Sequence, residues 1–134
     1  MSIVVGYVAT KEGKAALRAA SAEARLRNAR LVVINSNRGG RDLDREDAAK
    51  YEEELDLVRR QLDDAGVEHE VRQLVRGVEP AEDLVKVAED TSAELIVIGL
   101  RRRTPVGKLI LGSNAQRILL DAPCPVLAVK ADED

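Results

Sequence analysis

Short apolar runs recur along the chain and predict strands buried on both faces. Four of them are rich in aliphatic residues, mostly β-branched, and do not alternate with polar residues: residues 3–8, 31–34, 95–98 and 126–129. Such runs are typical of parallel strands that helices cover from both sides. Residues 67–75 differ, because Val67, Val71 and Val75 are separated by charged residues. This alternation predicts a half-exposed strand at a sheet edge.

Helical patterns fill the intervals between the first three strands. Residues from about 11 to 28 are rich in Ala, Leu, Arg and Glu, and Thr10 stands where it either caps this helix or faces a ligand. From about 44 to 65, apolar residues spaced 4, 3 and 4 apart form one helical face: Tyr51, Leu55, Val58 and Leu62. Gly66 is expected to end this helix.

Two further helices are predicted in the second half of the chain. Pro80 suits the first turn of a helix that turns Leu84, Val85 and Ala88 inward. A short fourth helix begins near Ser113 and ends before Pro123. Strands and helices therefore alternate throughout, which predicts an α/β fold: one doubly wound five-stranded parallel sheet with helices on both faces. We expect residues 1–134 to form one domain.

Composition excludes several classes of protein. Lysines and arginines number 21 and acidic residues 24, for a net charge of −3, and the only aromatic residues are two tyrosines. Few aromatics argue against base-stacking nucleic-acid modules. One Cys and one His exclude a disulfide framework and a Cys/His zinc cluster. Cys124 is expected to pack as a small apolar residue, and His69 to be structural. A free cysteine and the lack of an apolar span predict a cytoplasmic location, away from membranes and nucleic acid.

Basic residues gather directly after the strand at 95–98. Residues 99–117 contain no acid, whereas acids outnumber bases in residues 42–70, which we interpret as a solvated helix face. The bases of the first stretch are Arg101, Arg102, Arg103, Lys108 and Arg117. Ligands of parallel sheets bind beyond the carboxyl ends of the strands. The sequence therefore predicts an anionic ligand at this loop.

Glycines mark both ends of this basic loop. Gly99 permits a sharp turn after the strand, and Gly112 with Ser113 opens the last helix, whose N-terminal N–H groups suit a phosphate. In the alternative interpretation, Ser113 is an ordinary N-cap and the glycines are turn residues. The spacing is not that of a Walker A loop, and no Gly-x-Gly-x-x-Gly follows the first strand.

The segment at 95–129, LIVIGLRRRTPVGKLILGSNAQRILLDAPCPVLAV, resembles the C-terminal half of universal stress protein (UspA-like) domains. Nucleotide-binding members of that family carry Gly-x2-Gly-x9-Gly-Ser/Thr after the fourth strand, followed by a helix and Pro-Cys-Pro-Val. Gly99, Gly112 and Ser113 stand in register with this motif, and Cys124 lies between two prolines. The N-terminal strand and the Ala-rich helix also fit, so the resemblance covers essentially the whole chain.

The resemblance implies a strand order of 3-2-1-4-5, a site for ATP or AMP that can include Mg²⁺, and homodimers paired through the last strand, here residues 125–130. It places the nucleotide contacts at ten positions: Gly6, Tyr7, Val8, Ser36, Ile98, Gly99, Arg102, Gly112, Ser113 and Asn114. From the residues themselves we expect no catalytic residue and no protein metal site.

Two of these positions depart from the family pattern. Val8 stands where ATP-binding members usually have an Asp that contacts the adenine edge, which leaves only main-chain contacts for the base. Arg102 stands at the second motif glycine, where its guanidinium offers a bidentate phosphate contact in place of close backbone approach.

Three functions stay open at this point. The first is a nucleotide-binding regulatory protein, non-catalytic or very slow. The second is a nucleotide-independent dimeric interaction module with a vestigial cleft, favoured by Val8 and Arg102. The third, a slow ATPase, lacks an evident general base apart from Glu12. A receiver domain is excluded, because it needs acids after the first and third strands.

Overall fold

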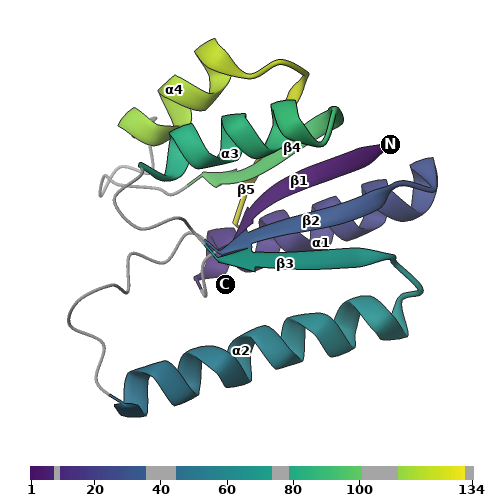
Figure 1. Cartoon of the computed structure of the whole chain (residues 1–134), viewed down its shortest axis with the longest axis vertical. Coiled ribbons are helices and arrows are strands. Elements are labelled where there is room, and N and C mark those ends of the chain that lie inside the picture. Colours follow the sequence, from purple (N-terminus) through teal and green to yellow (C-terminus); the bar gives the residue numbers. More distant parts are fainter. Residues whose placement is uncertain (8–9, 36–44, 74–78, 101–111, 132–134) are drawn as a thin grey trace.

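The computed structural model describes residues 1–7, 10–35, 45–73, 79–100 and 112–131, with the backbone alone at 45–51 and 73. Strands and helices alternate along the whole chain (Figure 1). Their bounds are β1 Ser2–Tyr7, α1 Lys11–Arg27, β2 Arg30–Asn35, α2 Arg45–Asp64, β3 His69–Gln73, α3 Pro80–Asp90, β4 Ala93–Leu100, α4 Ser113–Asp121 and β5 Val126–Lys130.

All five strands form one parallel sheet in the order β3-β2-β1-β4-β5, which confirms the predicted fold and strand order. The central β1 pairs with β2, where Tyr7 lies opposite Asn35, and with β4, where Val5 lies opposite Val97. Every crossover returns the chain to the same end of the sheet. The carboxyl ends of all five strands therefore meet at one edge.

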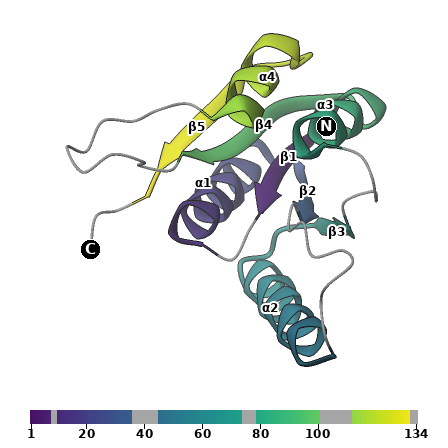
Figure 2. The ribbon, with the colours of Figure 1, turned by 90° about the vertical axis from the view of Figure 1, so that its left-hand side faces the viewer.

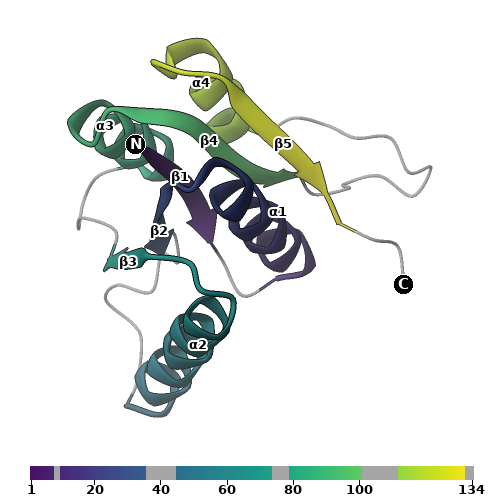
Figure 3. The same cartoon turned by 90° about the vertical axis from the view of Figure 1, so that its right-hand side faces the viewer.

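Helices cover both faces of the sheet (Figures 2 and 3). α1 and α2 pack on one face, where the core includes Ile3, Leu17 and Leu62. α3 and α4 pack on the other, where the core includes Val4, Leu84 and Ile118. The apolar runs supply both cores at once, since alternate residues of a strand point to opposite faces. This is why β1, β2 and β4 read as continuous apolar stretches.

Local signals set the helix ends as expected. Thr10 is the N-cap of α1 and accepts a hydrogen bond from the Gly13 amide at 3.2 Å. α2 ends at Asp64, and Gly66 follows it with a φ of 72°, a left-handed conformation that favours glycine. Pro80 is the first residue of α3.

Three predictions needed correction. The strand predicted at 67–75 begins at His69 rather than at Val67 and is described to Gln73, while residues 74 and 75 lie outside the described ranges; it does lie at the sheet edge. On α3, Val85 is only half-buried, and Val87 takes the inward position. β5 is not buried on both faces: it is the other edge strand, and 37% of Leu127 is exposed. Its composition resembles that of an inner strand, and only its place in the sheet makes it an edge.

Candidate functional site

The carboxyl edge of the sheet holds a topological switch point between β1 and β4. These neighbouring strands continue into helices on opposite faces, α1 on one and α4 on the other. A switch point of this kind leaves a crevice in which ligands of open α/β sheets bind. Gly6 and Tyr7 end β1, and Ile98 and Gly99 lie near the end of β4. The fold therefore brings these four predicted site residues to adjacent strand ends.

Two of those side chains do not face the edge. Tyr7 is 3% exposed and packs in the core beneath α1 and α2, where its hydroxyl donates a hydrogen bond to Glu54 Oε2 at 3.4 Å. Ile98 is buried in the opposite core, beneath α3 and α4. Only the main chain of these residues is left for a ligand at the edge. That is consistent with main-chain contacts but excludes a stacking role for the Tyr7 ring in this conformation.

Gly99 has a packing role that the sequence did not reveal. A Cβ atom at this position would lie 2.7 Å from the carbonyl carbon of Glu12 and closer still to its oxygen. Both atoms belong to the backbone in the first turn of α1, so they cannot move aside cheaply. Glycine is therefore required here for α1 to lie against β4.

The amino end of α4 is a second component of the site. Because β4 and β5 are parallel and α4 connects them, α4 runs back from the carboxyl edge and begins close to it. Gly112 is the N-cap and makes no side-chain capping bond, while its carbonyl accepts the Gln116 amide at 3.0 Å. The alternative of Ser113 as N-cap is wrong, since Ser113 is the first helical residue.

This helix end has the electrostatics of an anion site. The first turn of α4 contains no acidic residue, Ser113 is exposed, and Gly112 and Asn114 are half-buried. The first N–H groups of a helix lack intrahelical partners and carry partial positive charge. They can therefore donate to a phosphate or carboxylate, with the Ser113 hydroxyl as a further donor.

The part of the basic stretch that the structure describes forms ion pairs. Arg117 is its only member within the described ranges, and its guanidinium pairs with Glu82 of α3 and with Asp121. It therefore ties α4 to α3. Predicted contacts Val8, Ser36 and Arg102 lie outside the described residues, as do Arg101, Arg103 and Lys108.

The remaining candidate residues have structural roles. His69 Nδ1 lies 2.9 Å from the Val67 carbonyl oxygen. Cys124 is free and half-buried against the core of α3 and α4, and this burial raises the pKa of its thiol. Among the described residues, no cluster of His, Cys, Asp or Glu could hold a metal ion, and no helix there is long and apolar enough to cross a membrane.

A separate cavity of about 490 Å³ lies between α1 and α2, away from α4. Its basic residues Lys14, Arg18 and Arg25 were not singled out from the sequence. A signal was present, because Lys14, Arg18, Ser21 and Arg25 are spaced 4, 3 and 4 apart and so share one helix face.

A five-stranded parallel sheet in this order, with a glycine-capped helix at its switch point, defines a doubly wound α/β protein. The model of the Universal stress protein family matches residues 1–130, and the chain belongs to that family.

Individual relatives agree with this assignment. A universal stress protein of Mycolicibacterium smegmatis is 48% identical over 96% of both chains. The solved universal stress protein of Archaeoglobus fulgidus is 40% identical, with a TM-score of 0.80 over 97% of this chain and 98% of its own. A structure from the same organism, solved in complex with dAMP, is 35% identical, with a TM-score of 0.76 and the same coverage.

Proposed function

We propose that this chain is a nucleotide-binding regulatory protein that holds ATP or AMP at the carboxyl edge of the sheet. The observation that carries the proposal is the amino end of α4, capped by Gly112, without an acid in its first turn, beside the β1–β4 switch point. A relative of 35% identity was solved with dAMP, which supports the same ligand class.

The proposed contacts divide by chemistry. The nucleotide phosphates lie at the amino end of α4 and accept hydrogen bonds from its N–H groups and from Ser113. The base and sugar lie over the strand ends, where the main chain of Gly6, Tyr7 and Ile98 is available. Val8, Ser36 and Arg102 complete the proposed site from outside the described residues, with Arg102 paired to phosphate. Magnesium would enter with the nucleotide.

We propose that turnover is absent or very slow. The candidate general base, Glu12, lies in the first turn of α1, where its main-chain carbonyl packs against Gly99. To act as a base, its carboxylate would have to come within hydrogen-bond reach of the attacking water. A regulatory role requires only that the nucleotide binds, and hydrolysis is not needed for it. We further propose a cytoplasmic location, in keeping with the free Cys124.

Thermal unfolding with and without nucleotide tests the site. A ligand that binds only the folded chain stabilises it, by about 2.7 kcal/mol at a concentration 100 times Kd. We expect ATP or AMP to raise Tm, and Gly112→Asp to abolish the rise, because it places a carboxylate at the helix end where phosphate binds. Arg102→Glu should weaken the effect.

Leu120→Asp is the matched control, since it adds the same carboxylate near the other end of α4 at a residue that is 83% exposed. It should keep the response to nucleotide. Mass spectrometry of small molecules released from freshly purified, denatured protein gives an independent measurement. No rise in Tm at millimolar nucleotide, together with no released nucleotide, would favour the nucleotide-independent interaction module instead.

A further inference from the structure

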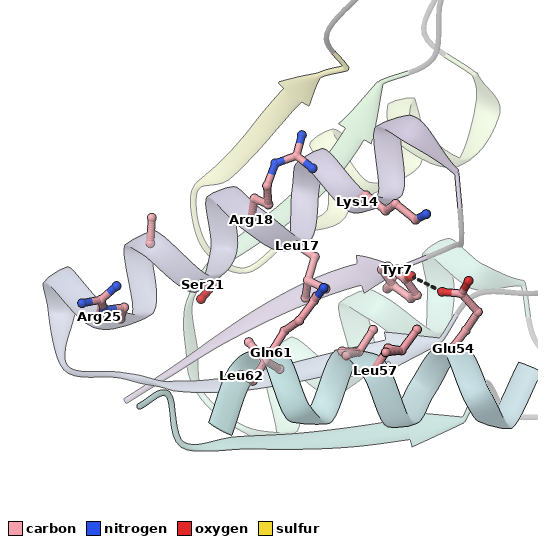
Figure 4. Close-up of a pocket in the computed structure, with 12 residues that line it drawn as sticks. Tyr7, Lys14, Leu17, Arg18, Ser21, Arg25, Glu54, Leu57, Gln61 and Leu62 are labelled. Atoms are coloured by element: carbon pink, nitrogen blue, oxygen red, sulfur yellow. Dashed lines mark hydrogen bonds between the residues drawn. The ribbon is translucent and has the colours of Figure 1, made fainter. Parts of the chain in front are cut away.

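The cavity between α1 and α2 has two facing walls with the periodicity of packed helices (Figure 4). α1 contributes Lys14, Leu17, Arg18 and Ser21 at helical spacing, and α2 contributes Leu57 and Gln61 among others. Two helices on one sheet face usually bring such stripes into direct contact, about 8–10 Å between axes. Here the stripes enclose about 490 Å³, within the range of roughly 300–1,000 Å³ typical of small-molecule sites.

The inner part of this cavity is apolar. Leu17, Val58 and Leu62 line it and are buried in the core beneath the two helices. Leu57 also lines it, yet 50% of its surface is exposed. Figure 4 shows Leu17 pointing from α1 toward α2. A ligand with an apolar body would remove this exposed leucine surface from water, at roughly 25 cal/mol per Å².

The outer part of the cavity carries positive charge. Lys14, Arg18 and Arg25 all line it from α1, and all three are exposed. Within the part of the chain that the structure describes, none of the three makes a salt bridge. The arginines nearby in the fold that do, Arg27 and Arg30, lie outside the cavity. Basic side chains without a salt-bridge partner at the mouth of an apolar cavity favour a ligand that carries an anionic group.

The single acid of the lining does not neutralise these bases. Glu54 is on α2 and accepts the hydrogen bond from Tyr7, whose ring forms the inner end of the cavity. The neutral hydroxyl leaves the carboxylate charge in place, so the lining carries three bases and one acid and keeps an excess of positive charge. This local excess of positive charge contrasts with the net charge of −3 of the whole chain.

From these observations we propose that the α1–α2 cavity binds an organic anion with an apolar body, the class of medium-chain carboxylates and alkyl phosphates. The chain packs against Leu17, Leu57 and Leu62, and the acidic head group lies among Lys14, Arg18 and Arg25. This site is separate from the one proposed for nucleotide, because α4 covers the opposite face of the sheet. It does not depend on that proposal.

Titration of the full chain with decanoate and with decyl phosphate, followed by amide NMR shifts, tests the site. We expect saturable binding of one molecule per chain, with shifts at Leu17, Ser21, Leu57 and Leu62. Decanol, which lacks the charge, should bind at least about fivefold more weakly, and added salt should weaken the anions only. The stronger of the two anions identifies the head group, and saturating AMP should displace neither.

Variants separate charge from shape. Arg18→Gln with Arg25→Gln should weaken both anions about fivefold while leaving decanol unchanged. Ser21→Phe, at a half-buried position in the α1 wall, should fill the space and block all three ligands. Lys86→Gln is the matched control, because it removes one exposed cation from α3 on the other face, and it should bind normally.

The proposal is overturned by any of three results. One is the absence of saturable anion binding up to about 1 mM, which corresponds to a binding free energy of about −4 kcal/mol. Another is equal affinity for decanoate and decanol in the wild-type chain. The third is shift changes confined to α4 and the strand ends, which would assign the anion to the nucleotide cleft.

Discussion

At the scale of single residues, Gly99 is the position where sequence and structure give different reasons for the same amino acid. The resemblance made it a nucleotide contact, whereas the structure shows the backbone of Glu12 where its side chain would be. The two roles are compatible, because a strand can press against α1 and still present its main chain at the edge. For the ligand role, a methyl group added to Gly99 would disturb nucleotide binding; for the packing role, it would destabilise the fold itself.

We therefore expect Gly99→Ala to destabilise the chain even without nucleotide. Overpacking against a backbone that cannot move aside costs about 1–3 kcal/mol. Urea unfolding followed by circular dichroism measures the loss. Gly66→Ala is the comparison, since open space surrounds that glycine and only its positive φ is strained, at a cost of about 1 kcal/mol. An unchanged unfolding free energy for Gly99→Ala would leave ligand contact as its only role.

Other residues mark the limit of what the sequence could predict. Tyr7 was assigned to the site by the family resemblance, which matches positions along the chain and does not tell what the side chain packs against. Its hydroxyl partner, Glu54, lies far along the chain on α2. By contrast, the capping role, one of the two left open for Thr10, could be predicted from the sequence, because capping depends on residues within one helical turn.

At the scale of elements, β3 shows how an edge strand is protected by charge. Glu70 on β3 forms ion pairs with Arg72 on the same strand and with Arg30 on β2. Charged side chains of this kind discourage edge-to-edge pairing with other chains. The hydrogen bond from Arg72, with the positive charges of Arg72 and Arg30, lowers the pKa of Glu70 below its ordinary value of 4.5, against a smaller opposing effect of burial.

A lowered pKa in the folded chain makes part of its stability depend on pH. The folded state favours the ionised carboxylate, so this contribution is fully present above pH 4.5 and is lost as the pH falls through the lower folded value. We expect Glu70→Gln to reduce the unfolding free energy at neutral pH, by no more than about 1 kcal/mol because the pair is exposed. The difference from wild type should vanish in acid.

Chemical denaturation at a series of pH values from neutral to acid measures this difference. Glu68→Gln serves as the control, because it removes the neighbouring exposed carboxylate, which has no arginine partner among the residues described. A Glu70→Gln difference that stays constant down to the most acidic pH would contradict the expected linkage.

An element was predicted well where its own buried face determines the sequence pattern. Features that depend on how several elements are arranged in space were predicted poorly. The apolar stripe of α2 was evident from Leu55, Val58 and Leu62, all of which are buried. The apolar pattern of β5 alone suggested a strand buried on both faces, because an apolar run does not tell how many strands lie beside it, whereas the family resemblance placed it correctly at the edge. The α1–α2 cavity was equally hidden, since its existence depends on the separation of two helices.

At the scale of the whole molecule, β5 is an edge strand of the sheet, with no strand on its outer side among the described residues. It pairs with β4 on one side, and Leu127 and Ala128 are exposed. An open apolar edge is a site for pairing with another chain. We propose that two copies pair through residues 125–130, as the family resemblance implies.

Light scattering at several protein concentrations tests this dimer. We expect Leu127→Lys to weaken association about tenfold or more, about 1.4 kcal/mol, because like charges would meet across a two-fold interface. Leu120→Lys, which places the same charge on exposed α4, should leave the dimer intact. A wild-type chain that remains monomeric at high concentration would refute pairing through β5.

The central position of β1 has a consequence for how the chain is made. Of the five strands, β1 is translated first, whereas β4, one of its two neighbours, is translated fourth. Until β4 emerges, Ile3, Val4 and Val5 have a partner on one flank only, and the nascent sheet carries an uncovered row of amide and carbonyl groups. The centre of the sheet is therefore completed late in biosynthetic folding, and the edge strand β5 can pair only after β4 is in place.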